Sequence, residues 1–534
     1  MNVRRLLIGG FMTVALAVAG AAVPTAASAA PSEGRKVDAV PTPVLDWAPC
    51  FTIAECATVR LPLDYDRPRG ATTEVAVLRV KARDQANKIG SLFVNPGGPS
   101  VAATRLALAA PLFMSDEVLD RFDIVGVDPR GIGLSANVRC FASAEQQAPV
   151  QRNLDVAFPV TRAEIRAYVE GSKQYGRACS TTGRPLSGAM STTEVARDHE
   201  VMRRAVGDRK LTFLGLSYGS VLGQYYANMF PDRFRALVVD GVIDAQAWVG
   251  NPRQILDERI NSSGGSARAL TEILRRCDRA GPTACAFAGG NFNTLARTLE
   301  AEPLAVGKYT VTYADFIYAV LEAMYLPTAA QEVPVLAAEM RDALHGDTAA
   351  LLRRLEAAEA GTPPDTRPYN NDLDAFYGVV CSDGRFPART EQWPAAVAAR
   401  EQVNPYFGAA LGWKDSACAS KTWTVRDEDR YTGPFNRRTA APVLVVGSFW
   451  DPSTNYAGAV ATSRRLPNSR LLSSTNFGHT AYGLGACATA ATDHYLLTGK
   501  PPADGTVCTD AAVASKQLAP LAVPFPRSVL AVPR

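Results

Sequence analysis

The chain has 534 residues, of which 47% are apolar and 20% are charged, values typical of a globular protein long enough for more than one domain. Its 56 basic and 52 acidic residues leave a formal net charge of +4. A charge this close to neutral gives no electrostatic case for nucleic acid or an anionic membrane surface as a partner.

The first 29 residues have the pattern of a secretory signal peptide. Arg4 and Arg5 form a basic start, an apolar run follows over residues 6–23, and Ala27-Ser28-Ala29 fits a small-x-small cleavage site. We expect cleavage after Ala29 and a secreted, extracellular protein whose net charge falls to +2. The alternative is an uncleaved membrane anchor. No later segment is apolar and long enough to span a bilayer, so no stable membrane association is expected after cleavage.

Short apolar runs that end in Gly, Asp, Asn or Ser are typical of buried parallel strands. They are Ser91–Asn95, Phe122–Asp128, Leu211–Leu216, Ala236–Asp240, Pro442–Gly447 and Arg470–Ser474. Helical segments such as Thr192–Val206 and Val221–Met229 lie between them, and Glu74–Val80 is expected among antiparallel edge strands. This alternation predicts an α/β fold around a mostly parallel sheet.

The block from 245 to 435 interrupts the alternation. It contains amphipathic helical segments, such as Ala314–Tyr325 and Val335–Leu344, and few strand-like runs. We interpret it as a helical cap inserted between two halves of the sheet domain. The predicted division is a signal peptide (1–29), the first part of the core (30–244), the cap (245–435) and the second part of the core (436–534).

Ten cysteines, an even number, follow residue 29. An even count in an exported chain predicts disulfides, although the sequence does not determine which cysteines pair. The simplest arrangement joins neighbours, because each bond then closes a local loop: Cys50–Cys56, Cys140–Cys179, Cys277–Cys285, Cys381–Cys418 and Cys487–Cys508. No C-x-x-C motif occurs and the histidines do not cluster near cysteines, so we expect neither a metal site nor a cofactor.

Residues 211–223 read LTFLGLSYGSVLG and place Ser217 inside a G-x-S-x-G motif. The motif alone is weak, and a tight structural turn is the alternative interpretation. Its setting is more specific, because an apolar strand precedes it and a helix-compatible run follows, as in a nucleophile elbow. Such a turn raises the serine above the sheet at a helix N-terminus, which favours developing negative charge. We therefore predict Ser217 as the nucleophile.

A serine hydroxyl needs a base to remove its proton, and the chain has four histidines. His479 follows the last apolar strand, in Asn476-Phe477-Gly478-His479-Thr480, where this type of fold places its catalytic histidine. His199 and His345 fall in predicted helical regions and are expected to be surface or packing residues. His494 lies in a later helix and is expected to be structural.

A catalytic histidine needs a carboxylate to hold its tautomer. Asp451 follows the strand Pro442–Gly447 and precedes His479 by 28 residues. The order Ser217, Asp451, His479 is that of an α/β-hydrolase, so we favour Asp451 as the acid. The competitor is Asp240, which ends the strand Ala236–Asp240 and is alternatively a turn residue.

The tetrahedral intermediate needs two hydrogen-bond donors for its oxyanion. One is expected from the backbone N–H of Tyr218, which follows the nucleophile. The second is expected from the loop Asn95-Pro96-Gly97-Gly98-Pro99-Ser100, where we favour Gly98 and keep Gly97 as the alternative. A simple Gly/Pro turn is the other interpretation of this loop.

These residues resemble a known family, the secreted α/β-hydrolases of the tripeptidyl aminopeptidase and proline iminopeptidase group, found mainly in actinobacteria. The likeness covers almost the whole chain after residue 29. Its carriers are the loop 95–99, the stretch FDIVGVDPRGIGLS over residues 122–135, the elbow 215–220, Phe230-Pro231, Asp240-Gly241-Val242, and the region 442–508. The resemblance implies a serine hydrolase that removes short peptides or residues from free N-termini, with Ser217 as nucleophile, His479 as base and Asp451 as acid.

One loop departs from this family. Ser100-Val101-Ala102-Ala103 stands where the family usually has glycine and further small residues after Gly-Gly-Pro. The altered loop leaves open a secreted esterase or lipase, or a hydrolase of small-molecule amides, with the same triad. A non-enzymatic binding protein on this scaffold and acyl transfer to an acceptor other than water are further alternatives.

An aminopeptidase must pair the substrate ammonium with an acid, because a buried ammonium is costly unless it is paired. The cap offers several carboxylates, and we favour none strongly, although Asp383 beside Cys381 resembles the family most. The candidates are Asp315, Glu322, Asp372, Asp374 and Asp383.

Overall fold

The computed structural model describes residues 33–361 and 367–509, so the predicted signal peptide (1–29) lies outside the described residues. Within these ranges ten strands form one sheet in the order β1-β2-β3-β5-β4-β6-β7-β10-β11-β12. The strands are β1 (Ala48–Cys50), β2 (Ala54–Pro62), β3 (Thr72–Val80), β4 (Gly90–Asn95), β5 (Phe122–Val127), β6 (Leu211–Leu216), β7 (Phe234–Asp240), β10 (Val443–Trp450), β11 (Ser469–Phe477) and β12 (Thr506–Cys508).

The sheet is antiparallel from β1 to β5 and parallel from β5 to β12. This confirms the predicted α/β architecture with a mostly parallel sheet. Strand β4 shows why its sequence is a continuous apolar run: Leu92 and Val94 pack into the core on one face, Phe93 packs on the other, and all three are buried. A strand covered on both faces has no solvent side that would require polar residues.

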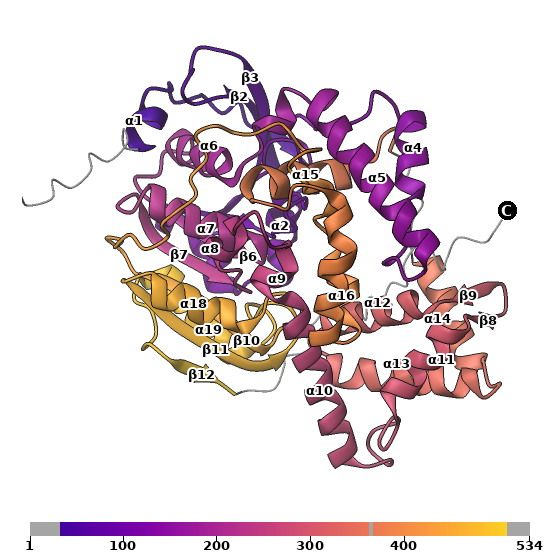
Figure 1. Cartoon of the computed structure of the whole chain (residues 1–534). Coiled ribbons are helices and arrows are strands. Elements are labelled where there is room, and N and C mark those ends of the chain that lie inside the picture. Colours follow the sequence, from indigo (N-terminus) through magenta and orange to yellow (C-terminus); the bar gives the residue numbers. More distant parts are fainter. Residues whose placement is uncertain (1–32, 362–366, 510–534) are drawn as a thin grey trace, which may run out of the picture.

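Helices cover both faces of the sheet (Figure 1). Helices α6 (Thr192–Ala205), α7 (Tyr218–Met229) and α18 (Tyr456–Arg465) pack on one face. Helices α2 (Ala103–Ala109), α3 (Asp116–Arg121) and α19 (Ala486–Thr498) pack on the other. The short helix α1 (Glu33–Asp38) contacts α6.

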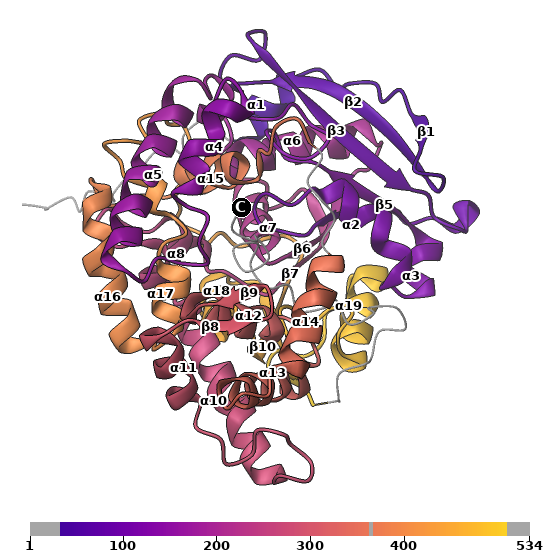
Figure 2. The ribbon, with the colours of Figure 1, turned by 90° about the vertical axis from the view of Figure 1, so that its right-hand side faces the viewer.

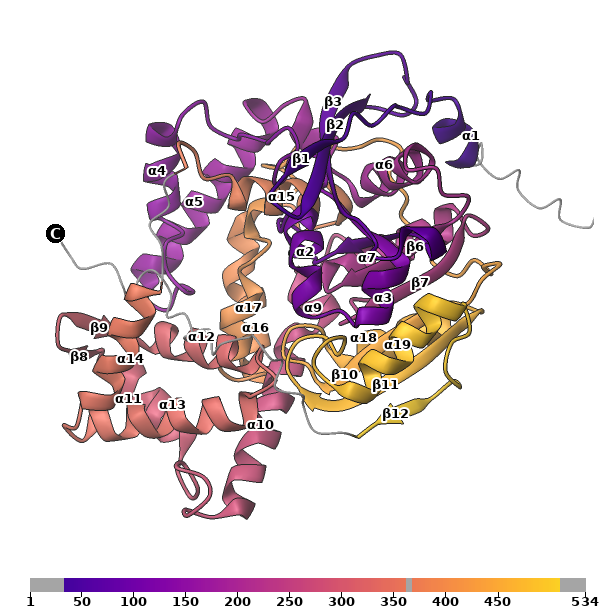
Figure 3. The same cartoon turned by 180° about the vertical axis from the view of Figure 1, so that it is seen from behind.

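A group of helices follows β7 and lies to one side of the sheet, as Figures 2 and 3 show. It consists of α8 (Ala245–Val249), α9 (Leu256–Ile260), α10 (Ser262–Ala280), α11 (Phe292–Ala301), α12 (Tyr313–Met324), α13 (Ala329–Leu344), α14 (Ala349–Ala360), α15 (Asp372–Asp383), α16 (Trp393–Val403) and α17 (Phe407–Gly412), with a two-stranded ribbon of β8 (Leu304–Val306) and β9 (Tyr309–Val311). We call this group the cap.

Two helices that precede the elbow also pack against the cap. They are α4 (Ala144–Arg152) and α5 (Arg162–Thr181), which lie beside α15 and α16 in Figures 1 and 2. Tyr175 on α5 donates a hydrogen bond to Asp374 on α15 at 2.5 Å, and Gln147 on α4 donates to the same carboxylate at 3.3 Å. The domain division at 244 and 435 stays a prediction, and the structure adds a second segment, earlier in the chain, that lies with the cap.

Five disulfides occur among the described residues, and their pairing is the neighbour pairing expected from the sequence. They join Cys50–Cys56, Cys140–Cys179, Cys277–Cys285, Cys381–Cys418 and Cys487–Cys508. Because disulfides persist in oxidising compartments, this number is typical of exported proteins. No helix within residues 33–361 and 367–509 combines the length and the apolar character needed to cross a membrane.

Candidate active site

Ser217 stands at the turn between strand β6 and helix α7, with φ +58° and ψ −123°, a conformation that L-residues rarely adopt. The two glycines of the motif explain how this turn is possible. A Cβ on Gly215 would lie 2.2 Å from the carbonyl oxygen of Gly219, and one on Gly219 would lie 2.6 Å from that of Asn95. Only glycine permits these approaches, so the motif holds Ser217 out of the sheet at a helix N-terminus.

The loop after β4 lies directly against this turn. A Cβ on Gly97 would fall 2.7 Å from the backbone nitrogen of Tyr218 and 2.8 Å from the Cβ of Ser217. The N–H of Gly97 already donates to the side-chain oxygen of Asn95 at 3.0 Å. That bond leaves the N–H of Gly98, rather than that of Gly97, as the candidate second oxyanion donor beside Tyr218.

His479 and Asp451 are in direct contact at the carboxyl ends of β11 and β10. The His479 Nδ1 lies 3.0 Å from each carboxylate oxygen of Asp451. Asp451 is buried and also accepts hydrogen bonds from the N–H groups of Ser453, Thr454 and Thr480 at 2.8 to 3.0 Å. These bonds hold the carboxylate in one orientation toward the ring.

The pair shifts the pKa values of both partners. Burial opposes ionisation of Asp451, but the His479 ring and the surrounding N–H donors outweigh it and hold the pKa of Asp451 below its usual value. Burial likewise disfavours the imidazolium, but the Asp451 carboxylate outweighs it and raises the pKa of His479 above its usual value. The Asp451 carboxylate thus favours the charged form of the His479 ring, the form that a general base acquires during proton transfer.

Asp240, the competing acid, lies close by but has different partners. Its carboxylate accepts hydrogen bonds from the backbone N–H groups of Ala481 at 3.0 Å and Tyr482 at 2.7 Å. Burial raises the pKa of Asp240 to about 6, and the neighbouring Asp451 charge acts in the same direction. Asp240 therefore anchors the backbone just after His479, whereas Asp451 contacts the ring.

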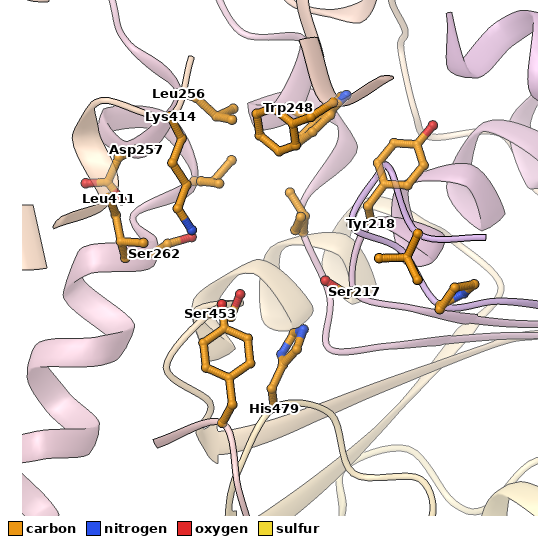
Figure 4. Close-up of a pocket in the computed structure, with 17 residues that line it drawn as sticks. Ser217, Tyr218, Trp248, Leu256, Asp257, Ser262, Leu411, Lys414, Ser453 and His479 are labelled. Carbon is orange, nitrogen blue, oxygen red and sulfur yellow. The ribbon is translucent and has the colours of Figure 1, made fainter. Parts of the chain in front are cut away.

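A pocket of about 320 Å³ opens above these groups. Figure 4 shows Ser217 and His479 side by side at its base, with Tyr218 on one side and Lys414 across the pocket. The cap contacts the edge of the sheet at His479. The backbone N–H of His479 donates to the carbonyl of Tyr325 at 3.0 Å, and the two rings meet edge-on with their centroids 5.1 Å apart. The lining residues are Pro96, Gly98, Val101, Ser217, Tyr218, Ile243, Trp248, Leu256, Asp257, Ile260, Ser262, Tyr325, Phe376, Leu411, Lys414, Ser453 and His479.

The other three histidines lie away from this pocket. His199 is buried between the rings of Phe93 and Phe213, so it is a packing residue. His345 and His494 are exposed on helix ends or faces.

All five candidate acids for an ammonium have partners within the protein. Asp315 closes the capping box of α12, Asp372 pairs with Arg367, and Asp374 accepts from Tyr175 and Tyr369. Asp383 accepts from Thr192 N at 2.7 Å and from the Trp248 indole at 2.9 Å, beneath the pocket wall. Glu322 on α12 shares a hydrogen bond with the side chain of Tyr318, and it also interacts electrostatically with Lys414 and His479, which line the pocket.

One acidic cluster outside the pocket has the spacing of a metal site. Oxygens of Glu194, Asp427 and Asp429 lie within 4.8 Å of one another. Arg197 pairs with Glu194 at 2.5 Å and with Asp429 at 2.7 Å, and Lys36 also pairs with Asp429. Glu194 and Asp429 are thus already compensated by side-chain cations, and Asp427 accepts a hydrogen bond from Ser191.

Sequence reasoning missed the residues with which the cap lines the pocket. Trp248, Asp257, Leu411 and Lys414 lie in four separate positions over 167 residues and belong to no motif. Nothing in the sequence marks them, because the packing of the cap alone brings them to one wall.

Two family models match the chain. One, described as an alpha/beta hydrolase fold, covers residues 92–263, and the other, described as a TAP-like protein, covers residues 404–508.

Among curated relatives, carboxylesterase B of Mycobacterium tuberculosis is 31% identical, over 94% of this chain and 96% of the relative. The tripeptidyl aminopeptidase of Streptomyces lividans is 28% identical, over 87% of this chain and 86% of the relative. The serine protease Hip1 of Mycobacterium bovis is 27% identical, over 87% and 91% respectively. A solved probable hydrolytic enzyme from Pseudomonas aeruginosa is 14% identical, with a TM-score of 0.33 over 86% of this chain and 99% of that one.

Proposed function

The chain belongs to the TAP-like family of α/β-hydrolases, which confirms the family expected from the sequence, and from this premise we propose that it removes residues or short peptides from free N-termini through a serine acyl-enzyme. That the protein is a serine hydrolase follows from the family; the peptidase activity, the triad and export are the proposal.

The proposed reaction proceeds in two acyl transfers. His479 takes the proton of the Ser217 hydroxyl as Ser217 attacks the substrate carbonyl. The N–H groups of Tyr218 and Gly98 stabilise the oxyanion, and His479 then protonates the leaving amine. Water, deprotonated by the same histidine, releases the acyl group and restores Ser217.

The observation that carries this proposal is the contact of His479 with Asp451 at the base of the pocket that Ser217 lines. The carboxylate selects the tautomer with the proton on Nδ1, which leaves Nε2 free to accept the serine proton. The strained turn at Ser217 adds support, because such strain is expected where a nucleophile must be presented.

Glu322 is the proposed anchor for the substrate ammonium. It projects from cap helix α12 and is half-buried, and burial raises the pKa of its carboxyl, an effect that Lys414, a hydrogen bond with Tyr318 and His479 partly offset. A carboxylate in poorly solvated surroundings gains most from a cationic ligand. The relatives named tripeptidyl aminopeptidase are consistent with this choice.

A second candidate function, an esterase with the same triad, is favoured by the charge of the pocket. Asp257 is the one acidic side chain among the described lining residues, and Arg400 pairs with it at 3.0 Å. A wall without a free carboxylate suits a substrate that has no ammonium, and the relative named carboxylesterase B points in the same direction.

Three chromogenic substrates separate the two functions: a tripeptide anilide with a free N-terminus, the same anilide N-acetylated, and a short acyl ester. We expect release from the free peptide, little from the acetylated one, and none from Ser217→Ala protein. Turnover of the ester but of neither peptide would contradict the aminopeptidase proposal and retain the esterase.

The ammonium anchor is tested by Glu322→Gln. We expect KM for the free peptide to rise about tenfold or more, as for the loss of a charge-assisted hydrogen bond, while ester hydrolysis changes little. Glu356→Gln removes an exposed cap carboxylate outside the pocket and is the matched control. An unchanged KM in Glu322→Gln would remove Glu322 from the site.

A further inference from the structure

Lys414 follows helix α17 and lines the active-site pocket. Its side chain is exposed there, and Figure 4 shows it reaching into the pocket from the wall opposite Tyr218. The proposed peptide chemistry assigns it no task, because neither proton transfer nor oxyanion binding uses a lysine from the cap.

Lys414 has no direct anionic partner among residues 33–361 and 367–509. No carboxylate oxygen lies within 4.0 Å of its ammonium there, and the ammonium donates no hydrogen bond. Asp257, its acidic neighbour in the wall, is fully engaged: it accepts from Ser263 N at 2.8 Å, from Ser263 Oγ at 2.5 Å and from Arg400 Nε at 3.0 Å. The pocket therefore contains an uncompensated cation and a compensated anion.

The charge of Lys414 faces the pocket. The protein atoms packed around it lower the pKa of its ammonium, and the more distant charges of Glu322 and Asp257 offset that effect in part. An ammonium that lines a pocket without an ion-pair partner within 4.0 Å can form a charge-assisted hydrogen bond with an anion that enters the pocket. Such an arrangement is expected where a ligand supplies the missing charge.

We propose that Lys414 binds a carboxylate of the substrate, so that the enzyme prefers small acyl compounds or peptides that carry a free carboxyl group near the scissile bond. The inference rests on the proposed hydrolase function and deepens it by naming the charge of the substrate. Ser217 and Lys414 line the same pocket of about 320 Å³, so one bound substrate can contact both.

Two matched substrate pairs test the proposal. Trialanine is compared with its C-terminal amide, which places the charge on the leaving group, and monoethyl adipate is compared with ethyl hexanoate, which places it on the acyl group. The measured quantity is the ratio of kcat/KM for the anionic to the neutral member. The charge of Lys414 also lowers the pKa of His479, so Lys414→Met would change the rate with any substrate. This general effect is the same for both members of a pair and cancels in the ratio, which therefore reports only the preference for the anionic substrate.

For wild-type protein we expect a ratio above one in at least one pair. Lys414→Met should lower that ratio by about tenfold or more, as for the loss of one charge-assisted hydrogen bond, and Lys414→Arg should retain most of it. The control is Lys421→Met, which removes an exposed lysine outside the pocket and should leave the ratio unchanged.

Equal ratios in wild-type and Lys414→Met protein for both pairs would overturn the inference. The proposed function is judged separately, by hydrolysis of the neutral members and its loss in Ser217→Ala protein. Hydrolysis of neither pair by wild-type protein would overturn the function and the inference together.

Discussion

The carboxyl edge of the sheet and the cap line the same pocket, but they are built differently. The edge contributes Ser217, Asp451 and His479, and each is held by backbone contacts: a glycine-dependent turn, a set of N–H donors and the carbonyl of Tyr325. The cap contributes side chains such as Trp248 and Lys414 from helix ends and loops. The comparison teaches that the proposed catalytic groups lie at the ends of strands, whereas the proposed substrate contacts of Lys414 and Glu322 come from the cap.

The largest effect is expected at the edge. Ser217→Ala removes the proposed nucleophile, and kcat should fall on the order of 10⁴-fold or more with every substrate, because alanine has no hydroxyl to attack the carbonyl. The measurement is kcat for the substrate that wild-type protein turns over best. Circular dichroism of the variant is the control for folding, and substantial residual turnover would identify a different nucleophile.

The two acids at the edge should differ strongly. Asp451→Asn should lower kcat on the order of 10³- to 10⁴-fold, because an amide does not hold the same histidine tautomer or stabilise the imidazolium. Asp240→Asn is the matched control and should cost less than about tenfold in kcat, because Asp240 contacts backbone N–H groups rather than the ring. A larger loss in Asp240→Asn than in Asp451→Asn would reverse the assignment.

The pH profile reports on the same pair. The pKa of His479 is raised above its usual value, and the neutral ring is the active form. The kcat/KM should therefore fall as pH is lowered through that raised pKa, by about tenfold per pH unit below it. In Asp451→Asn protein the midpoint should move to lower pH, because the carboxylate is what raises the pKa. The profile is measured with an ester substrate, because a peptide would add the titration of its own ammonium. If the midpoint of the pH profile does not move in Asp451→Asn protein, the Asp451 carboxylate does not raise the pKa of His479.

The smallest expected effect is one on stability, in the cap. Trp248→Phe removes one donor from the buried Asp383, so the free energy of unfolding should fall by about 1 to 3 kcal/mol. Trp423→Phe is the matched control: its indole is buried without a hydrogen-bond partner among the described residues, and its loss should cost less. Urea denaturation measures both. Equal destabilisation would show that the bond to Asp383 contributes nothing.

The strands were predictable because a strand that is buried on both faces has a continuous run of apolar residues in the sequence. Each of the six predicted apolar runs lies on a strand of the sheet, from β4 to β11. The disulfides follow the simplest expectation from the sequence, in which each cysteine pairs with its neighbour along the chain. The contact of His479 with Asp451 follows the expected chain order, because loops after parallel strands meet at one edge of the sheet.

The cap was predictable only as a helical block. Its helices could be recognised by amphipathic spacing, as for α12 and α13, but their packing could not. The attachment of α4 and α5 to the cap depends on hydrogen bonds such as Gln147 with Asp374, 227 residues apart in the chain. The same limit applies to the candidate acids for the substrate ammonium, because the sequence did not reveal the partners that each of them has in the structure.

The sequence by itself determined the proposed chemistry: a serine on a glycine turn, with an acid and a histidine in the order expected for the fold. Local backbone geometry and the edge of a parallel sheet are enough to bring these groups together. Only the tertiary structure decided the charge of the pocket, where Lys414 has no ion-pair partner among residues 33–361 and 367–509 while Arg400 compensates Asp257. Such a balance depends on contacts between residues more than 140 positions apart, and no pattern of spacing along the chain records them.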